Sequence, residues 1–251
     1  PGVRHDYAGY IAWRGLVGEA ALPEAVLGEL RDYLSFSLPQ GEQMLGYLVA
    51  GPGENLSPGQ RTFNWVWYRP AHAHDALPEL LTDDRGNRYE MSIPPDRIRR
   101  AAIDAMREAA DRGLSPQYRS GVELTAQPFI QPIYDLVSPR LVHGRVLILG
   151  DAAFVARPHV GLGVTKAALD AAALSRAFGA RDIDAALADW ERERLAFGNA
   201  VVTRARELGA YLQAQLLTAA EREQAERNRS AEVIMRQTAS PQALLLAAVT
   251  H

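Results

Sequence analysis

The chain has 251 residues, which is enough for one large domain or for two small ones that each bury a core. A formal net charge of −3 argues against nucleic acid or an anionic membrane surface as partner, and 47% hydrophobic with 23% charged residues is typical of a globular protein. The sequence contains no cysteine, which excludes disulfides, cysteine-ligated zinc, iron–sulfur clusters and thiol nucleophiles.

The first half of the chain is predicted to form strands that loops connect. Aromatic and β-branched residues predict strands over 7–17, 44–49 and 62–68, of which the last is the most aromatic. Leucine and valine at helical spacing after a proline predict a short helix over 23–34, and 51–59 is a turn-rich loop. Strands joined mainly by loops favour an antiparallel sheet.

A helix and an extended segment follow. Apolar residues at helical spacing predict a helix over 96–112, which two prolines open and Gly113 closes. Residues 122–134 are expected to be extended, and Pro128 and Pro132 place them at a sheet edge or in an irregular strand.

The pattern changes in the second half of the chain. Residues 145–149 form a nearly continuous apolar run, which predicts a strand buried on both faces. Small residues predict a helix over 163–178, charged helices are expected over 182–217 and 221–229, and a short apolar tail follows residue 241. Because a strand of parallel type needs neighbouring strands, we expect that part of this fold lies outside the chain.

The stretch from Leu147 to Asp170, LILGDAAFVARPHVGLGVTKAALD, carries the strongest functional signal. Gly150 allows close approach of a ligand, and Asp151 follows the predicted strand, where its carboxylate can accept hydrogen bonds from a polyol. Two further glycines precede a helix whose free N–H groups and positive dipole end favour a ligand that becomes negative. Each feature alone also occurs in ordinary turns, but the ordered series is far more specific.

This series resembles the second flavin-binding motif of the single-component, para-hydroxybenzoate hydroxylase-like flavoprotein monooxygenases, which are FAD-dependent aromatic hydroxylases. Further likeness lies in YAGYIAWRG (7–15), FNWVWYRP (63–70) and QPFIQPIYDL (127–136), so the resemblance covers nearly the whole chain. The chain departs from the usual family pattern at Phe154 and at Val-Thr-Lys (164–166), and both departures favour the dihydroxypyridine branch of the family.

The resemblance implies an FAD site. Asp151 would bind the ribityl hydroxyls, Pro158 would lie near the isoalloxazine face, and the N–H groups after the glycines would face the pyrimidine edge. Lys166 is expected either to add charge to this site or to reach solvent. The full set of implied cofactor-binding residues is Gly150, Asp151, Arg157, Pro158, His159, Gly161, Gly163, Val164 and Thr165.

The resemblance also implies an activity. NAD(P)H would reduce FAD, and O2 would supply the oxygen atom for hydroxylation of an electron-rich aromatic or N-heteroaromatic ring, such as a dihydroxypyridine. Arg14 is expected either to reach the flavin or a substrate anion, or to be a structural ion-pair partner, and no catalytic base is assigned. Candidate substrate contacts, each of which competes with a role in the core, are Tyr47, Trp65, Phe129, Gln131 and Tyr134.

These features predict an α+β or α/β fold, with a mostly antiparallel substrate-binding sheet and the C-terminal strand–loop–helix of an FAD-binding, Rossmann-like domain. The expected limits are 1–140 for the sheet domain, 141–180 for the FAD-binding part and 181–251 for a helical region. Family members begin with a GxGxxG unit that this chain lacks, so we expect a fragment truncated by about 150 residues. Two alternatives stay open: a non-catalytic remnant or oligomerisation module without FAD, and a flavin oxidase without ring hydroxylation.

Location and further ligands complete the expectations. No run approaches the ~20 apolar residues that span a bilayer, and the chain starts without a signal pattern, so a cytoplasmic protein is expected. His72 and His74, with Asp75 beside them, are expected to lie in a solvated loop rather than in a metal site. Lys166 is the only lysine beside 26 arginines, which is typical of GC-rich bacterial genes. The resemblance leaves a homodimer open.

Overall fold

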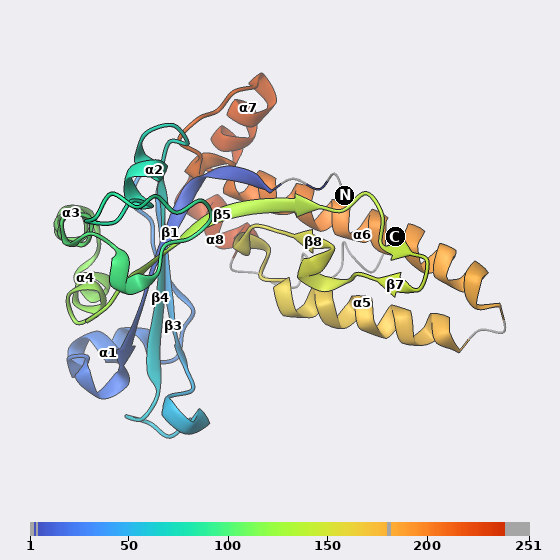
Figure 1. Cartoon of the computed structure of the whole chain (residues 1–251). Helices are drawn as coiled ribbons and strands as arrows, with labels where there is room; N and C mark the ends of the chain where they lie inside the picture. Colours follow the sequence, from blue (N-terminus) through green and yellow to red (C-terminus); the bar gives the residue numbers. More distant parts are fainter. Residues whose placement is uncertain (1–2, 4, 180–181, 239–251) are drawn as a thin grey trace. The chain divides into compact units, whose positions relative to one another are not determined.

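The computed structural model describes residues 3, 5–179 and 182–238, and the tail predicted after residue 241 lies outside them. The chain divides into two compact units (Figure 1). The sheet unit holds residues 9–133 and 212–215, and the helical unit holds 1–8, 134–211 and the chain from residue 216 on. These units are defined by compactness alone, so the domain limits expected from the sequence stay a prediction. None of the helices in the described ranges is both long and apolar enough to cross a lipid bilayer.

The sheet unit is built on an antiparallel sheet, as the sequence predicts. Within it the strand order is β2-β3-β4-β1-β5, and both β1 and β5 continue into the helical unit. Trp67 on β4 stands opposite Trp13 on β1 and Met44 on β3, so large apolar side chains share one face. The strands are β1 (Asp6–Gly18), β2 (Ser35–Ser37), β3 (Gln43–Val49), β4 (Thr62–Pro70) and β5 (Phe129–Val137).

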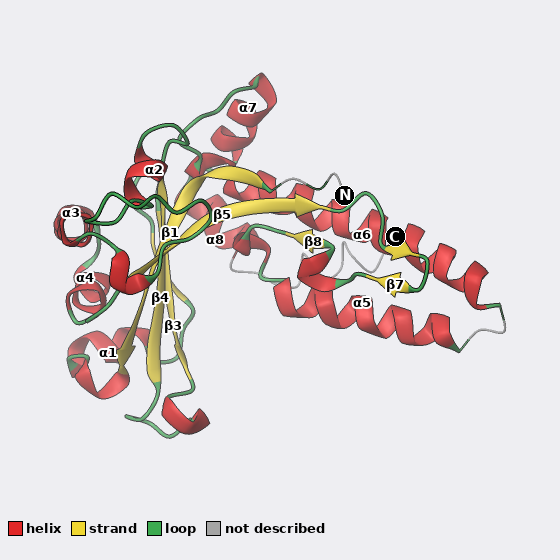
Figure 2. Ribbon diagram, viewed as in Figure 1, coloured by secondary structure: helices red, strands yellow, loops and turns green. Residues whose placement is uncertain are grey.

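Helices cover this apolar face of the sheet (Figure 2). Phe63 and Trp65 on β4, Met106 on α3 and Tyr118 on α4 are fully buried, which places the core between the sheet and these helices. Glycines make room for the rings, since a Cβ at Gly46 would lie 2.4 Å from Phe63. The helices of the unit are α1 (Glu24–Leu30), α2 (Ala76–Leu80), α3 (Arg100–Gly113) and α4 (Pro116–Glu123).

Two predictions for this unit need correction. The helix expected over 96–112 begins only at Arg100, because a single 3-10 turn, Pro95–Arg97, and an extended Ile98 come before it. The extended segment expected over 122–134 begins only at Phe129, because its first residues belong to α4. Pro116 in the first turn of α4 is the missed signal, since proline favours that position.

The helical unit pairs two long helices with short strands. Helices α5 (Gly163–Phe178) and α6 (Ile183–Gly209) pack on each other, and α5 has the predicted limits. Helix α6 ends at Gly209 instead of continuing to 217. The remaining elements are β6 (Val142–His143), β7 (Val146–Leu147), β8 (Phe154–Val155), α7 (Ala219–Arg227) and α8 (Ala231–Thr238).

The strand predicted over 145–149 as buried on both faces is wrong in this structure. Only Val146–Leu147 is a strand, its ladder partner among the described residues is β6, and Val146 is 63% exposed. Gly144, at φ 65°, turns the chain back into this two-residue hairpin. The apolar run therefore correctly indicated a strand, but it did not predict whether the strand is buried.

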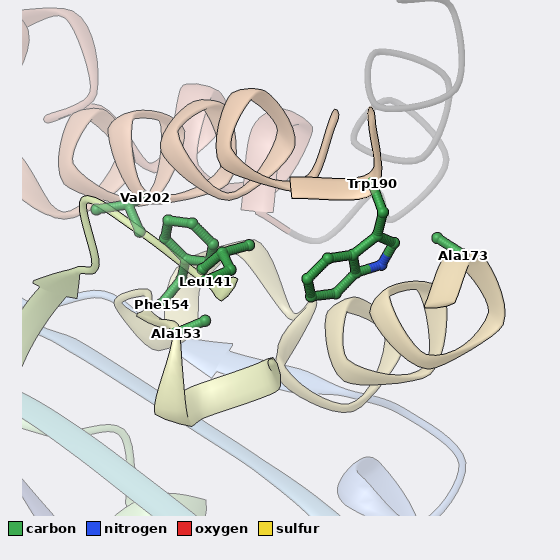
Figure 3. Close-up of a cluster of buried hydrophobic side chains, with 6 residues drawn as sticks. All are labelled: Leu141, Ala153, Phe154, Ala173, Trp190 and Val202. Atoms are coloured by element: carbon green, nitrogen blue, oxygen red, sulfur yellow. The ribbon is translucent and has the colours of Figure 1, made fainter. Parts of the chain in front are cut away.

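A cluster of apolar side chains forms the core of the helical unit (Figure 3). Its members are Leu141, Ala153, Phe154, Ala173, Trp190 and Val202. The Phe154 ring lies against α6 at Gly198, where an added Cβ would come within 2.4 Å of it. Phe154, which departs from the usual family pattern, thus fills a space that a glycine on α6 leaves open.

Candidate functional site in the helical unit and on the sheet

The first feature of the candidate site is a rigid turn at Gly150 and Asp151. Gly150 has φ 60°, a left-handed conformation that favours glycine, and its N–H donates to Asp170 Oδ2 at 2.9 Å. Asp170 is buried on α5 and also accepts from Arg194 Nε of α6 at 3.0 Å. One buried carboxylate thus ties the turn, α5 and α6 together. The sequence prediction gave Asp170 no role, although an acidic residue on a helix of small residues was a usable signal.

The Asp151 side chain is open to solvent. It is 77% exposed, and its Oδ1 lies 3.4 Å from Nζ of Lys166, which is 1% exposed. The backbone of Asp151 is fixed because it belongs to the short 3-10 turn Gly150–Ala152, which Asp170 holds. The carboxylate is therefore an anchored acceptor available to hydroxyl groups of a ligand.

The N-terminus of α5 provides donors. Leu162 precedes the helix, and no side chain caps its first amides, so the N–H groups of Gly163, Val164 and Thr165 have no partner within the helix. Val164 is 87% exposed. A Cβ added to Gly161 or Gly163 would meet no atom within 4 Å, so the backbone here borders open space. This end of α5 can accept a ligand that carries negative charge or carbonyl oxygens.

Arg157 and His159 point into the protein. Arg157 donates from Nε to Asp135 Oδ2 at 3.0 Å, and its Nη2 forms an ion pair with the same oxygen at 3.0 Å. Arg206 of α6 also donates to this oxygen, at 3.0 Å. Burial, followed by the nearby Arg157 charge, lowers the pKa of His159 to about 3, so its ring is neutral. Pro158, between them, is exposed. The buried pair therefore fixes the loop, and their predicted contact with flavin stays a prediction.

Some of the substrate candidates gather on one face of the sheet unit. Arg14 Nη1 donates to Gln131 Oε1 at 2.9 Å, and the Arg14 guanidinium lies 5.4 Å from the centre of the Phe129 ring. Tyr47 shares this face, since the register pairs it with Asn64, two residues from Val66, the partner of Arg14. We call the group the polar face; its members are Arg14, Tyr47, Asn64, Tyr68 and Gln131.

The polar face places a cation among phenol and amide groups. Tyr68 is buried, which raises the pKa of its hydroxyl, while the Arg14 charge acts in the opposite direction. Asn64 and Tyr68 were not predicted as site residues, although they alternate with the core tryptophans in FNWVWY and must lie on the opposite face. The Arg14 side chain pairs with an amide and an aromatic ring here, which leaves its positive charge unneutralised by these contacts.

The structure places the other two substrate candidates elsewhere. Trp65 lies on the helix-covered face, is fully buried and donates from Nε1 to Thr125 Oγ1 at 2.8 Å, which is the environment of a core residue. Tyr134 belongs to the helical unit, where its ring lies 5.5 Å from that of Tyr7. Their contact with a substrate stays a prediction.

The close pair His72 and His74 forms no larger cluster in the described part of the chain. The two rings lie 5.5 Å apart, and His72 Nδ1 is 3.6 Å from Asp75 Oδ1. Within residues 3, 5–179 and 182–238, no group of three histidine, cysteine or acidic side chains could hold a metal ion.

The residues that carry this arrangement match two known protein families. Residues 7–135 match a family described as FAD binding domain-like, and residues 130–205 match the FAD binding domain family. The two matches together cover the polar face, the turn at Gly150 and the start of α5.

Similar proteins with named activities include two curated relatives. A 2,6-dihydroxypyridine 3-monooxygenase of Paenarthrobacter nicotinovorans is 30% identical over 213 residues, which are 84% of this chain and 53% of that protein. An FAD-dependent urate hydroxylase of Klebsiella pneumoniae is 31% identical over 198 residues, which are 75% of this chain and 41% of that protein. The chain thus spans about half the length of the curated relatives it matches.

A solved structure agrees with the sequence comparison. The 2,6-dihydroxypyridine-3-hydroxylase of Arthrobacter nicotinovorans superimposes with a TM-score of 0.78 at 29% identity, covering 84% of this chain and 53% of that one. This chain therefore has the mixed α and β fold predicted from the sequence, with a mostly antiparallel sheet, and this fold matches that of the solved relative.

Proposed function

Because the chain belongs to the FAD-binding family of flavoprotein aromatic hydroxylases, we propose that it serves an FAD-dependent monooxygenase that hydroxylates an electron-rich aromatic or N-heteroaromatic ring. NAD(P)H and O2 are the proposed co-substrates. A dihydroxypyridine-like ring is the proposed substrate, which the names of the relatives in Paenarthrobacter and Arthrobacter support.

The proposal rests mainly on the turn at Gly150 and Asp151 beside the uncapped end of α5. The groups fit FAD: an exposed carboxylate suits the ribityl hydroxyls, and free amides beside two glycines suit a planar ring with carbonyl oxygens. Asp151 would accept hydrogen bonds, and the N–H groups of Val164 and Thr165 would donate them. Bound FAD would supply the redox chemistry that activates O2.

The polar face supports the proposed substrate class. A fixed guanidinium favours the ionised form of a hydroxylated ring, and the Phe129 ring offers a stacking surface next to it. Gln131 holds the Arg14 side chain in place. Tyr47, 36% exposed, adds a phenol that can donate or accept a hydrogen bond.

Replacing Asp151 tests the cofactor assignment. In the full-length gene product, Asp151→Ala is expected to reduce the flavin content after purification severely, because the turn loses its only exposed carboxylate acceptor. Asp189→Ala is the matched control, since Asp189 is 70% exposed on α6 and pairs with Arg192 at the surface. Equal flavin content in wild type and both variants would refute the assignment.

Product analysis tests the reaction. The full-length protein with a dihydroxypyridine, NAD(P)H and 18O2 is expected to give a product that carries one 18O atom. NADH or NADPH consumption that yields peroxide without labelled product would instead indicate a flavin oxidase. A protein that takes up no FAD would favour the non-catalytic alternative.

A further inference from the structure

Lys166 has an environment that the residues around it do not explain. It is the only lysine of the chain, it lies in the first turn of α5, and its side chain is 1% exposed. Among the described residues Asp151 is its one ion-pair partner, at 3.4 Å, and the Nζ atom has no hydrogen-bond acceptor. An ammonium group can donate three hydrogen bonds, so its donor capacity is unused.

Two physical effects oppose this position. Burial removes the ammonium from water, which costs free energy. The partner carboxylate is itself 77% exposed and hydrated, so its attraction offsets only part of that desolvation cost. The first turn of a helix carries the positive end of the helix dipole, which disfavours a cation. A purely structural residue here would more readily be apolar, as Leu162 in the preceding turn is.

The same region already offers uncapped amides. The N–H groups of Gly163, Val164 and Thr165 begin the helix whose first turn carries Lys166, and the Lys166 Nζ lies 3.4 Å from Asp151. With 26 arginines elsewhere, a lysine at this place is not a default of the composition. A compact ammonium group fits a confined site where the broad guanidinium fork does not.

We propose that Lys166 is a flavin ligand, whose Nζ donates a hydrogen bond to an oxygen of the bound cofactor and stabilises its reduced, anionic form. This inference rests on the proposed function, because it requires FAD at the end of α5. Asp151 would hold the ammonium in place and also accept from the ribityl hydroxyls. Lys166 would act through its charge and through hydrogen bonding.

The test compares Lys166→Met with Arg176→Met in the full-length gene product. Methionine has about the length and the apolar stem of lysine. The control, Arg176→Met, removes a positive charge from the exposed far end of the same helix. The measurements are the melting temperature without flavin, the Kd for FAD by fluorescence quenching, and the midpoint potential of the bound flavin.

For Lys166→Met we expect an unchanged or higher melting temperature without flavin, because a poorly compensated buried charge is removed. We also expect a Kd for oxidised FAD raised tenfold or more. If the variant also binds reduced FAD another tenfold more weakly than it binds oxidised FAD, relative to the wild type, the two-electron midpoint potential of the bound flavin falls by about 30 mV. Arg176→Met should match the wild type in all three measurements.

The outcomes separate the two hypotheses. If the wild type binds FAD and Lys166→Met binds it with the same Kd and potential, Lys166 is not a flavin ligand, while the proposed function stands. If Lys166→Met lowers the melting temperature without flavin in proportion to its effect on binding, the role is structural and the inference is wrong. If the wild type binds no FAD, both hypotheses fail.

Discussion

Gly198 offers a direct test of how the helical unit is packed. Replacing an interior helix glycine by alanine normally stabilises a helix by about 1 kcal/mol. At Gly198 the added Cβ would lie 2.4 Å from two carbons of the Phe154 ring and 2.6 Å from a third, and Phe154 is only 1% exposed. Overpacking of this kind costs about 1–3 kcal/mol, so Gly198→Ala should be destabilising by up to about 2 kcal/mol.

The sign of the effect should depend on the ring. In a Phe154→Ala background the same Gly198→Ala change meets no ring atoms, so it should become neutral or stabilising. The coupling free energy between the two changes should therefore be at least about 1 kcal/mol. Gly28→Ala on α1 is the matched control, because a Cβ there would meet nothing within 4 Å, and it should stabilise by up to about 1 kcal/mol.

Urea unfolding followed by tryptophan fluorescence measures these differences, since Trp190 lies in the same core cluster as Phe154 (Figure 3). A stabilising Gly198→Ala in the wild-type background would refute the packing described for α6. Additive effects of the two substitutions would do the same.

Three further predictions concern the site. Gly163→Val should leave the flavin-free melting temperature within about 1 °C, since a Cβ there meets nothing, yet reduce flavin uptake; unimpaired uptake would show that no ligand approaches this backbone. Asp170→Asn removes the buried counter-ion of Arg194 and leaves only the exposed Glu193 carboxylate beside it, so it should cost about 3–5 kcal/mol of unfolding free energy in urea titrations. A loss below about 1 kcal/mol would contradict the linking role of Asp170. The pKa of His159 is lowered from 6.5 to about 3, so its contribution to stability is complete above pH 6.5 and is lost as the pH falls towards 3. His159→Gln should remove up to about 1.4 kcal/mol per pH unit from the slope of unfolding free energy in that window, and an identical slope in both proteins would argue against a buried neutral ring.

Local patterns were sufficient to predict several elements. The limits of α5 follow from glycines before a run of small residues, and the strands β1, β3 and β4 follow from dense aromatic and β-branched residues. These signals work because short-range propensity and the local period agree with the final fold.

Long-range partners were beyond the reach of the sequence. Asp170 meets Arg194, 24 residues away, and Asp135 meets Arg157 and Arg206 from two different segments. Even where the helix of small residues around Asp170 gives a signal, nothing in the local spacing identifies the arginines that these carboxylates meet. The burial of Lys166 was equally open, because the sequence allowed both a site role and a reach to solvent, and only packing decides between them.

The burial of Lys166 affects how the chain can be modified at lysine. The folded chain presents no ε-amino group at its surface, so acylating reagents, acetyltransferases and ubiquitin ligases find no lysine target on it. Modification of Lys166 would require local opening of the start of α5. The rate of that modification would therefore report how often this part of the helix opens.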